Sequence, residues 1–122
     1  MKKILYVTGS RAEYGIVRRL LTMLRETPEI QLDLAVTGMH CDNAYGNTIH
    51  IIEQDNLNII KVVDININTT SHTHILHSMS VCLNSFGDFF SNNTYDAVMV
   101  LGDRYEIFSV AIAASMHNIP LI

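Results

Sequence analysis

The chain has 122 residues, of which 48% are hydrophobic and 16% charged, and its formal net charge at pH 7 is −4. This size and composition predict one globular domain at most, with enough apolar side chains for a packed core, and exclude a disordered chain. The acidic balance argues against a protein that binds the nucleic-acid backbone, and no apolar run approaches membrane-spanning length.

The cysteines and the first residues predict a cytoplasmic protein. Cys41 and Cys82 lie far apart and form no CxxC pair, as is usual for reduced thiols in the cytosol. The apolar run at residues 4–7 follows two lysines but is too short for the hydrophobic region of a secretion signal. We therefore expect no membrane partner.

Apolar runs alternate with amphipathic stretches along the chain. A first strand is expected at residues 4–8, and the helix expected at 11–26 carries four apolar residues at core-facing spacing: Val17, Leu20, Leu21 and Leu24. Later strands are expected at residues 32–37, 59–65 and 97–101, with a fifth beginning at 119–122. Later helices are expected around Ile49 and Ile52, at 71–90 and at 104–116.

This alternation predicts an α/β fold with right-handed crossovers and a parallel, Rossmann-like sheet covered on both faces. The expected strand order is 3-2-1-4-5, which makes the first and fourth strands neighbours at a switch point where ligands bind beside the strands' carboxyl ends. The chain ends within an apolar run at residues 119–122, where an exposed polar terminus is usual, so we expect a domain cut short there.

Two similar turns follow the first and fourth expected strands. Residues 9–13 and 102–106 each contain a glycine, a candidate helix cap, an arginine and, three positions after the cap, a glutamate. Ser10 and Glu13 fit a capping box, and Glu106 is expected to be a capping partner as well. An arginine in a first helical turn opposes the helix dipole, so Arg11 predicts a bound anion; alternatively, it pairs with Glu13 or Asp103.

Other polar residues have two interpretations each. Asp103 is either a helix N-cap or a catalytic carboxylate beside Arg104. His40 directly follows the second strand, at the level of both turns, and is either a site residue or a loop histidine. Neither G-x-G-x-x-G nor G-K-[ST] occurs, so no nicotinamide cofactor or ATP is expected. No metal is expected at the histidines of the third helix, which do not share one helical face: His72, His74 and His77.

Four segments in order resemble one enzyme family: residues 9–15 (GSRAEYG), 38–40 (GMH), 45–48 with 52–55 (YGNT and IEQD), and 102–106 (GDRYE). They are similar to the hydrolysing UDP-N-acetylglucosamine 2-epimerases of sialic acid biosynthesis, above all the bacterial capsule type. The resemblance implies a GT-B fold of two Rossmann-like domains. Residues 1–122 would then be the N-terminal domain, truncated at its C-terminal end, and the second domain would be absent.

The resemblance also implies the reaction and the roles of residues. UDP-N-acetylglucosamine and water become UDP and N-acetylmannosamine through a 2-acetamidoglucal intermediate, without a cofactor. Asp103 matches a catalytic carboxylate, and the residues that match substrate-binding positions are Arg11, Gly15, His40 and Arg104. Ser10, Glu13 and Glu106 would support them. We expect the full-length enzyme to form homo-oligomers, either dimers or tetramers, and this chain to be inactive alone.

Three alternatives compete with the hydrolysing epimerase. A flavodoxin-like binding or signalling domain fits the length, but a receiver domain needs acidic residues after the first strand, where this chain has Ser10 and Arg11. A fragment of a sugar-nucleotide glycosyltransferase has the same fold. Non-hydrolysing epimerases are nearer relatives, but the segments at 45–47 and 102–104 favour the hydrolysing branch.

Overall fold

The computed structural model describes residues 1–41, 48–65, 71–102 and 104–122, and in these ranges the chain is an α/β protein with a parallel sheet. Within the described ranges the sheet has four strands in the order β3-β2-β1-β4, which confirms the predicted order. The strands are β1 (Lys2–Thr8), β2 (Ile30–Thr37), β3 (Ile59–Val63) and β4 (Ala97–Met99). The helices are α1 (Arg11–Arg25), α2 (Ile49–Gln54), α3 (His72–Asn92) and α4 (Tyr105–Met116), and a 3-10 turn covers Gly38–Cys41.

The segment predicted as a fifth strand lies beside β4. Leu121 and Val98 form a parallel bridge, and the backbone N–H of Val98 donates to the carbonyl of Pro120 over 2.9 Å. The segment therefore has the predicted place in the sheet, although it pairs through a single bridge and not through a full strand. Pro120 has no N–H to extend the pairing.

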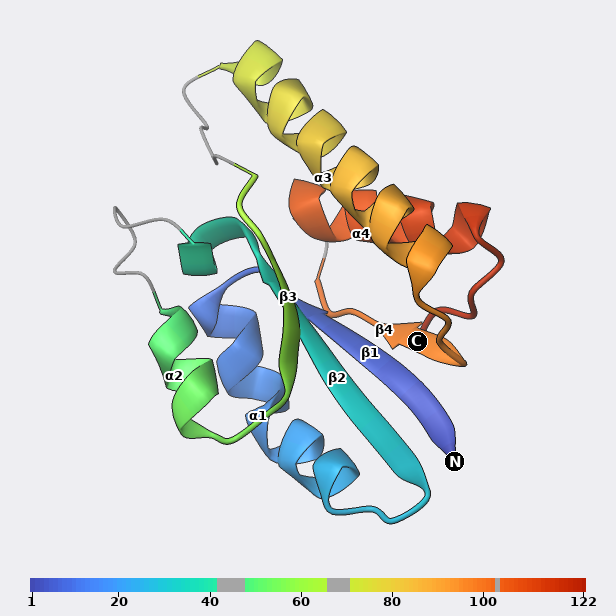
Figure 1. Ribbon diagram of the computed structural model, residues 1–122. Helices are drawn as coiled ribbons and strands as arrows, with labels where there is room; N and C mark the ends of the chain where they lie inside the picture. Colours follow the sequence, from blue (N-terminus) through green and yellow to red (C-terminus); the bar gives the residue numbers. More distant parts are fainter. Residues whose placement is uncertain (42–47, 66–70, 103) are drawn as a thin grey trace.

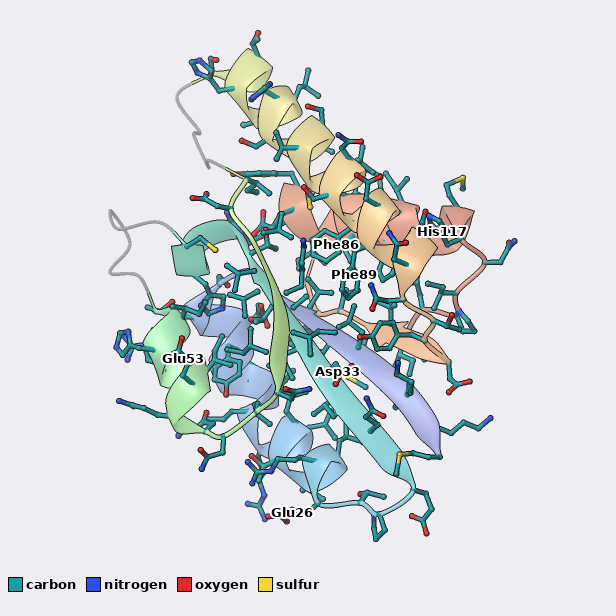
Figure 2. All side chains as sticks on the ribbon, in the orientation of Figure 1. Glu26, Asp33, Glu53, Phe86, Phe89 and His117 are labelled. Carbon is teal, nitrogen blue, oxygen red and sulfur yellow. The ribbon has the colours of Figure 1, made fainter. Side chains whose placement is uncertain are left out.

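The helices cover both faces of the sheet, with α1 and α2 on one face and α3 and α4 on the other (Figure 1). Side chains alternate along β1, so that Tyr6 joins the core beneath α1 and α2, whereas Leu5 and Val7 join the core beneath α3 and α4. Figure 2 shows Phe86 and Phe89 between α3 and the sheet. None of the helices in the described ranges is long and apolar enough to cross a membrane.

The core face of α1 differs from the predicted one. The helix rests on Tyr14, Val17 and Leu21, which are buried, whereas Leu20 is 45% exposed. Leu20 lies at the edge of this contact line, about 100° around the helix from Leu21. The expectation that Leu20 faces the core was therefore wrong.

A buried polar group lies toward the amino end of the sheet, away from the expected site. The carboxylate of Asp33 on β2 accepts hydrogen bonds from the Tyr95 hydroxyl over 2.8 Å and from Asn58 Nδ2 over 2.9 Å. Both carboxylate oxygens thus have partners, as buried polar groups require. This cluster joins β2 to the segments that precede β3 and β4.

Candidate active site

The turns that follow β1, β2 and β4 meet at one edge of the sheet, called here the carboxyl edge. Gly38 has φ +63°, and a Cβ there would lie 2.6 Å from the Gly9 carbonyl oxygen and 3.0 Å from Glu106 Oε1. A Cβ on Gly9 would lie 2.8 Å from that same Glu106 oxygen. The Glu106 side chain therefore lies against Gly9, which brings the two predicted turns together, as the strand order predicted.

The turn between β1 and α1 is built around the buried carboxylate of Glu13. Ser10 is the N-cap of α1, and the reciprocal hydrogen bonds between Ser10 and Glu13 confirm the predicted capping box. Glu13 also accepts hydrogen bonds from the Gly9 N–H and the Tyr6 hydroxyl, both over 2.6 Å, and from the Thr8 hydroxyl over 2.5 Å. Burial, with the hydrogen bond and charge of Glu13, raises the pKa of Tyr6 above its ordinary value.

Sequence analysis missed the parts that Tyr6 and Thr8 have in this network. Both belong to β1 and read as ordinary strand residues. The one available signal was that Tyr6 lies within the apolar run and Thr8 ends it, a few residues before Glu13. Spacing alone does not show that their hydroxyls converge on Glu13.

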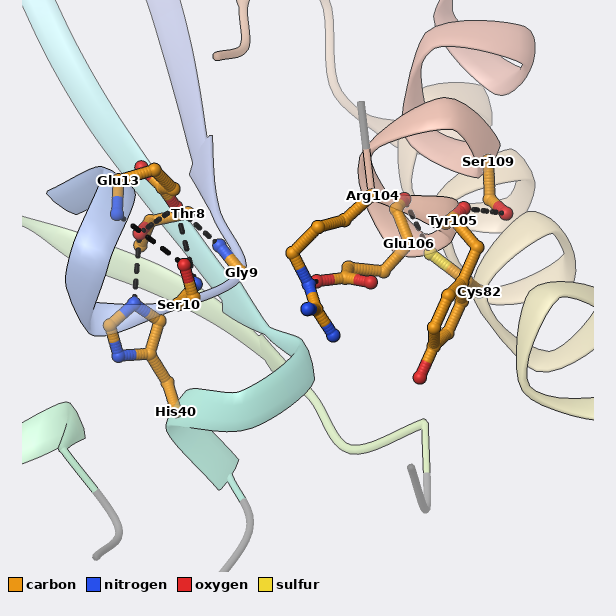
Figure 3. Close-up of polar contacts among 10 residues, drawn as sticks. All are labelled: Thr8, Gly9, Ser10, Glu13, His40, Cys82, Arg104, Tyr105, Glu106 and Ser109. Atoms are coloured by element: carbon orange, nitrogen blue, oxygen red, sulfur yellow. Dashed lines mark hydrogen bonds and ion pairs between the residues drawn. The ribbon is translucent and has the colours of Figure 1, made fainter. Parts of the chain in front are cut away.

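His40 joins this network from the turn after β2. Its side chain is buried, with Nε2 2.9 Å from Thr8 Oγ1 (Figure 3). Its Nδ1 lies 2.7 Å from Thr48 Oγ1. Because Thr8 donates its proton to Glu13, its oxygen accepts from Nε2–H, and Nδ1 accepts from Thr48. Burial lowers the pKa of His40 to about 4, against the opposing effect of a backbone hydrogen bond at Ser10. His40 is therefore a neutral imidazole near pH 7.

Arg104 and Glu106 form an ion pair at the start of α4. Arg104 Nε lies 2.5 Å from Glu106 Oε1, and the guanidinium lies 5.6 Å from the ring centre of Tyr105. Glu106 was expected to be a capping partner, and this expectation was wrong. The N-cap of α4 is Arg104, without a side-chain cap hydrogen bond, so Glu106 lies one position too early to reach back to it.

Two predicted binding residues lie on the first turns of α1. Arg11 is exposed, and it has no ion pair within the described ranges. The alternative pairing with Glu13 is not found, because other donors surround that carboxylate. Gly15 is exposed too, and a Cβ there would have nothing within 4 Å.

Some predictions concern residues outside the described ranges. The two interpretations of Asp103 are such predictions, and so is the family resemblance of the segment 45–47. The N-cap position that one interpretation gave to Asp103 belongs to Arg104. His72, His74 and His77 are exposed on α3, and no cluster of three potential metal ligands occurs among residues 1–41, 48–65, 71–102 and 104–122.

The carboxyl edge can recognise an anion. The first turn of α1 presents backbone N–H groups at the positive end of the helix dipole, and Arg11 and Arg104 add two guanidinium groups at the starts of α1 and α4. Glu13 is surrounded by donors, so it does not oppose an anion as an unpaired carboxylate would. This arrangement suits the phosphates of a nucleotide.

Comparison with known proteins agrees with this chemistry. The chain is 99% identical to polysialic acid biosynthesis protein P7 of Escherichia coli, over all of this chain and 31% of that protein. It is 38% identical to a hydrolyzing UDP-N,N'-diacetylbacillosamine 2-epimerase of Legionella pneumophila, over all of this chain and 32% of that protein. The chain thus spans about a third of the length of these relatives.

A solved structure has the same fold. The UDP-N-acetylglucosamine 2-epimerase of Methanocaldococcus jannaschii, crystallised with UDP-N-acetylglucosamine and UDP, matches with a TM-score of 0.79 at 21% identity. The match covers 98% of this chain and 31% of that structure. The sequence profile of the UDP-N-acetylglucosamine 2-epimerases matches residues 22–122, which are most of the chain. The chain therefore belongs to the UDP-N-acetylglucosamine 2-epimerase family.

Proposed function

We propose that this chain forms one wall of the active site of a hydrolysing UDP-N-acetylglucosamine 2-epimerase. The enzyme would convert UDP-N-acetylglucosamine and water to UDP and N-acetylmannosamine for sialic acid synthesis. The observation that carries the proposal is the close approach of Glu106, the ion-pair partner of Arg104, to Gly9 and Gly38, at the switch point of a sheet from this family.

The reaction needs charge stabilisation and proton transfer. Removal of a proton from C2 and departure of UDP from C1 give 2-acetamidoglucal, and addition of water then gives the manno sugar. Arg11, Arg104 and the first amides of α1 would stabilise the negative charge on the departing diphosphate. Asp103 would transfer a proton. His40 would hold the turn after β1 in place, because its buried neutral ring bonds to Thr8.

We assign the rest of the site to polypeptide that the relatives contain and this chain does not. In this proposal residues 1–122 belong to the N-terminal domain of a GT-B enzyme, and the opposite wall, with most uridine contacts, belongs to the other two thirds. The enzyme would be a cytoplasmic homo-oligomer. The 122-residue chain alone is expected not to epimerise.

The test uses a full-length protein in which this chain replaces the matching segment of the Escherichia coli relative. Asp103→Asn in that protein is expected to lower kcat at least about a hundredfold, because proton transfer by a side chain contributes on that scale. N-acetylmannosamine release measures the rate, and circular dichroism checks the fold. Near-normal turnover would make Asp103 a structural residue, and release of N-acetylmannosamine by the 122-residue chain alone would overturn the assignment of the missing wall.

A second substrate is favoured by one observation. The Legionella pneumophila relative, 38% identical to this chain, is named for UDP-N,N'-diacetylbacillosamine. The two nucleotide sugars share the UDP group that Arg11 and Arg104 would bind, so this part of the site does not discriminate between them. Comparing kcat/KM for the two substrates in the full-length protein decides the question, and we expect UDP-N-acetylglucosamine to be preferred.

A further inference from the structure

We propose that Glu106 is a positioning residue that holds Arg104 in the orientation that meets the diphosphate. The inference rests on the proposed UDP-binding role of Arg104. It assigns to Glu106 a part in recognition, although Glu106 itself need not touch the substrate.

The burial of Glu106 is not explained by stability. The side chain is 0% exposed, and Oε2 has no hydrogen-bond partner within the described ranges. A carboxylate taken out of water loses its hydration, and a single partner on one oxygen compensates this loss only in part. Glu13 and Asp33 are also buried, but each has partners on both oxygens. Of these three buried carboxylates, Glu106 is therefore the one whose burial a functional role would explain.

The neighbouring turns are shaped around Glu106. Gly9 does not have a positive φ, so backbone conformation does not require a glycine there. Space does, because a Cβ would lie 2.8 Å from Glu106 Oε1 and 3.0 Å from Cγ. Gly38 also leaves room for this side chain, because a Cβ there would lie 3.0 Å from Oε1 and 3.2 Å from Cγ. Two turns from different strands thus accommodate one side chain of α4.

The contact with Arg104 fixes an orientation. Glu106 Oε1 accepts a hydrogen bond from Nε, at the base of the guanidinium fork. In Figure 3 the two terminal nitrogens point away from the ribbon of α4. A guanidinium held at Nε keeps its forked end in one plane, which suits two hydrogen bonds to phosphate oxygens. A lysine at position 104 would have no Nε–H for Glu106 to hold.

A double-mutant cycle on UDP binding tests the inference in the full-length protein described above. Arg104→Lys is expected to weaken UDP binding, measured by calorimetry, about tenfold or more. Glu106→Gln keeps the side-chain size but removes the charge, and we expect it to weaken binding roughly threefold to thirtyfold. In the Arg104→Lys background the same substitution is expected to change the Kd less than about twofold, because Glu106 acts through Arg104.

Asp33→Asn is the matched control, since Asp33 is a buried carboxylate of the same sheet outside the carboxyl edge. It is expected to lower the melting temperature and leave the Kd for UDP unchanged. If Glu106→Gln does not fold, Gly9→Ala takes its place in the cycle, because the new Cβ would displace Glu106 Oε1.

The outcomes separate this inference from the proposed function. Equal effects of Glu106→Gln in both backgrounds, or no effect in either, would overturn the positioning role and leave the proposed function intact. A normal Kd in Arg104→Lys would instead remove Arg104 from UDP binding and overturn the proposed function at that residue.

Discussion

The two turns at the carboxyl edge have similar sequences but different structures. In the turn after β1, Glu13 is the third residue of α1, so its side chain reaches back to the N-cap and closes the turn on itself. In the turn after β4, α4 begins at Tyr105, so Glu106 is only the second residue and projects toward Gly9 and Gly38. Because Glu106 lies one position closer to the helix start than Glu13 does, it contacts the turns after β1 and β2 and does not cap its own helix.

This difference suggests that the two turns serve different purposes. The first is complete within itself, since strand hydroxyls and backbone amides satisfy Glu13. The second leaves a buried carboxylate oxygen without a partner in the described ranges and uses the other to hold an arginine. The carboxylate of the first turn therefore stabilises the fold, whereas we propose that the carboxylate of the second turn positions a binding residue.

Replacing the glutamate of each turn by glutamine compares the two turns directly, and the replacement of Glu13 has the largest expected effect. Glu13→Gln places an amide NH2 among at least four donors, so we expect it to lower the free energy of unfolding by about 3 kcal/mol. Glu106→Gln removes a buried charge with a single partner and is expected to change it by less than about 1 kcal/mol. Urea unfolding of the chain measures both, and a loss at Glu106 as large as at Glu13 would end the distinction.

His40, which bonds to Thr8 at the first turn, gives a pH dependence of similar size. The pKa of His40 is about 4 in the folded chain and 6.5 as the ordinary value. Above pH 6.5 the ring is neutral in both states. Between pH 6.5 and 4 only the unfolded chain takes up the proton, so stability falls with falling pH, by about 3 kcal/mol in total.

Unfolding curves from pH 7 to pH 4 measure this contribution. His40→Gln should flatten the profile in that window, whereas replacement of the exposed His72 serves as the control. An unchanged profile in His40→Gln would show that His40 is not held neutral in the folded chain.

Patterns over many residues predicted the fold better than the site. Apolar runs separated by helical stretches indicated the strand order, because burial on both faces of a parallel sheet leaves a continuous apolar signal. The Ser10–Glu13 capping box was predictable because its partners are three residues apart. The role of Glu106 was not, because it depends on where α4 begins and on glycines 97 and 68 positions earlier in the chain.

The smallest expected effect concerns Gly15, the remaining predicted binding residue of α1. A glycine within a helix lowers stability relative to alanine, and nothing in the described chain would contact a Cβ at this position. Gly15→Ala is therefore expected to raise the free energy of unfolding by about 0.5–1 kcal/mol. If the open space beside Gly15 receives the substrate, the same substitution weakens UDP binding in the full-length protein. A gain in stability with an unchanged Kd for UDP would restrict the binding surface of the first turn to Arg11 and the amides at the start of α1.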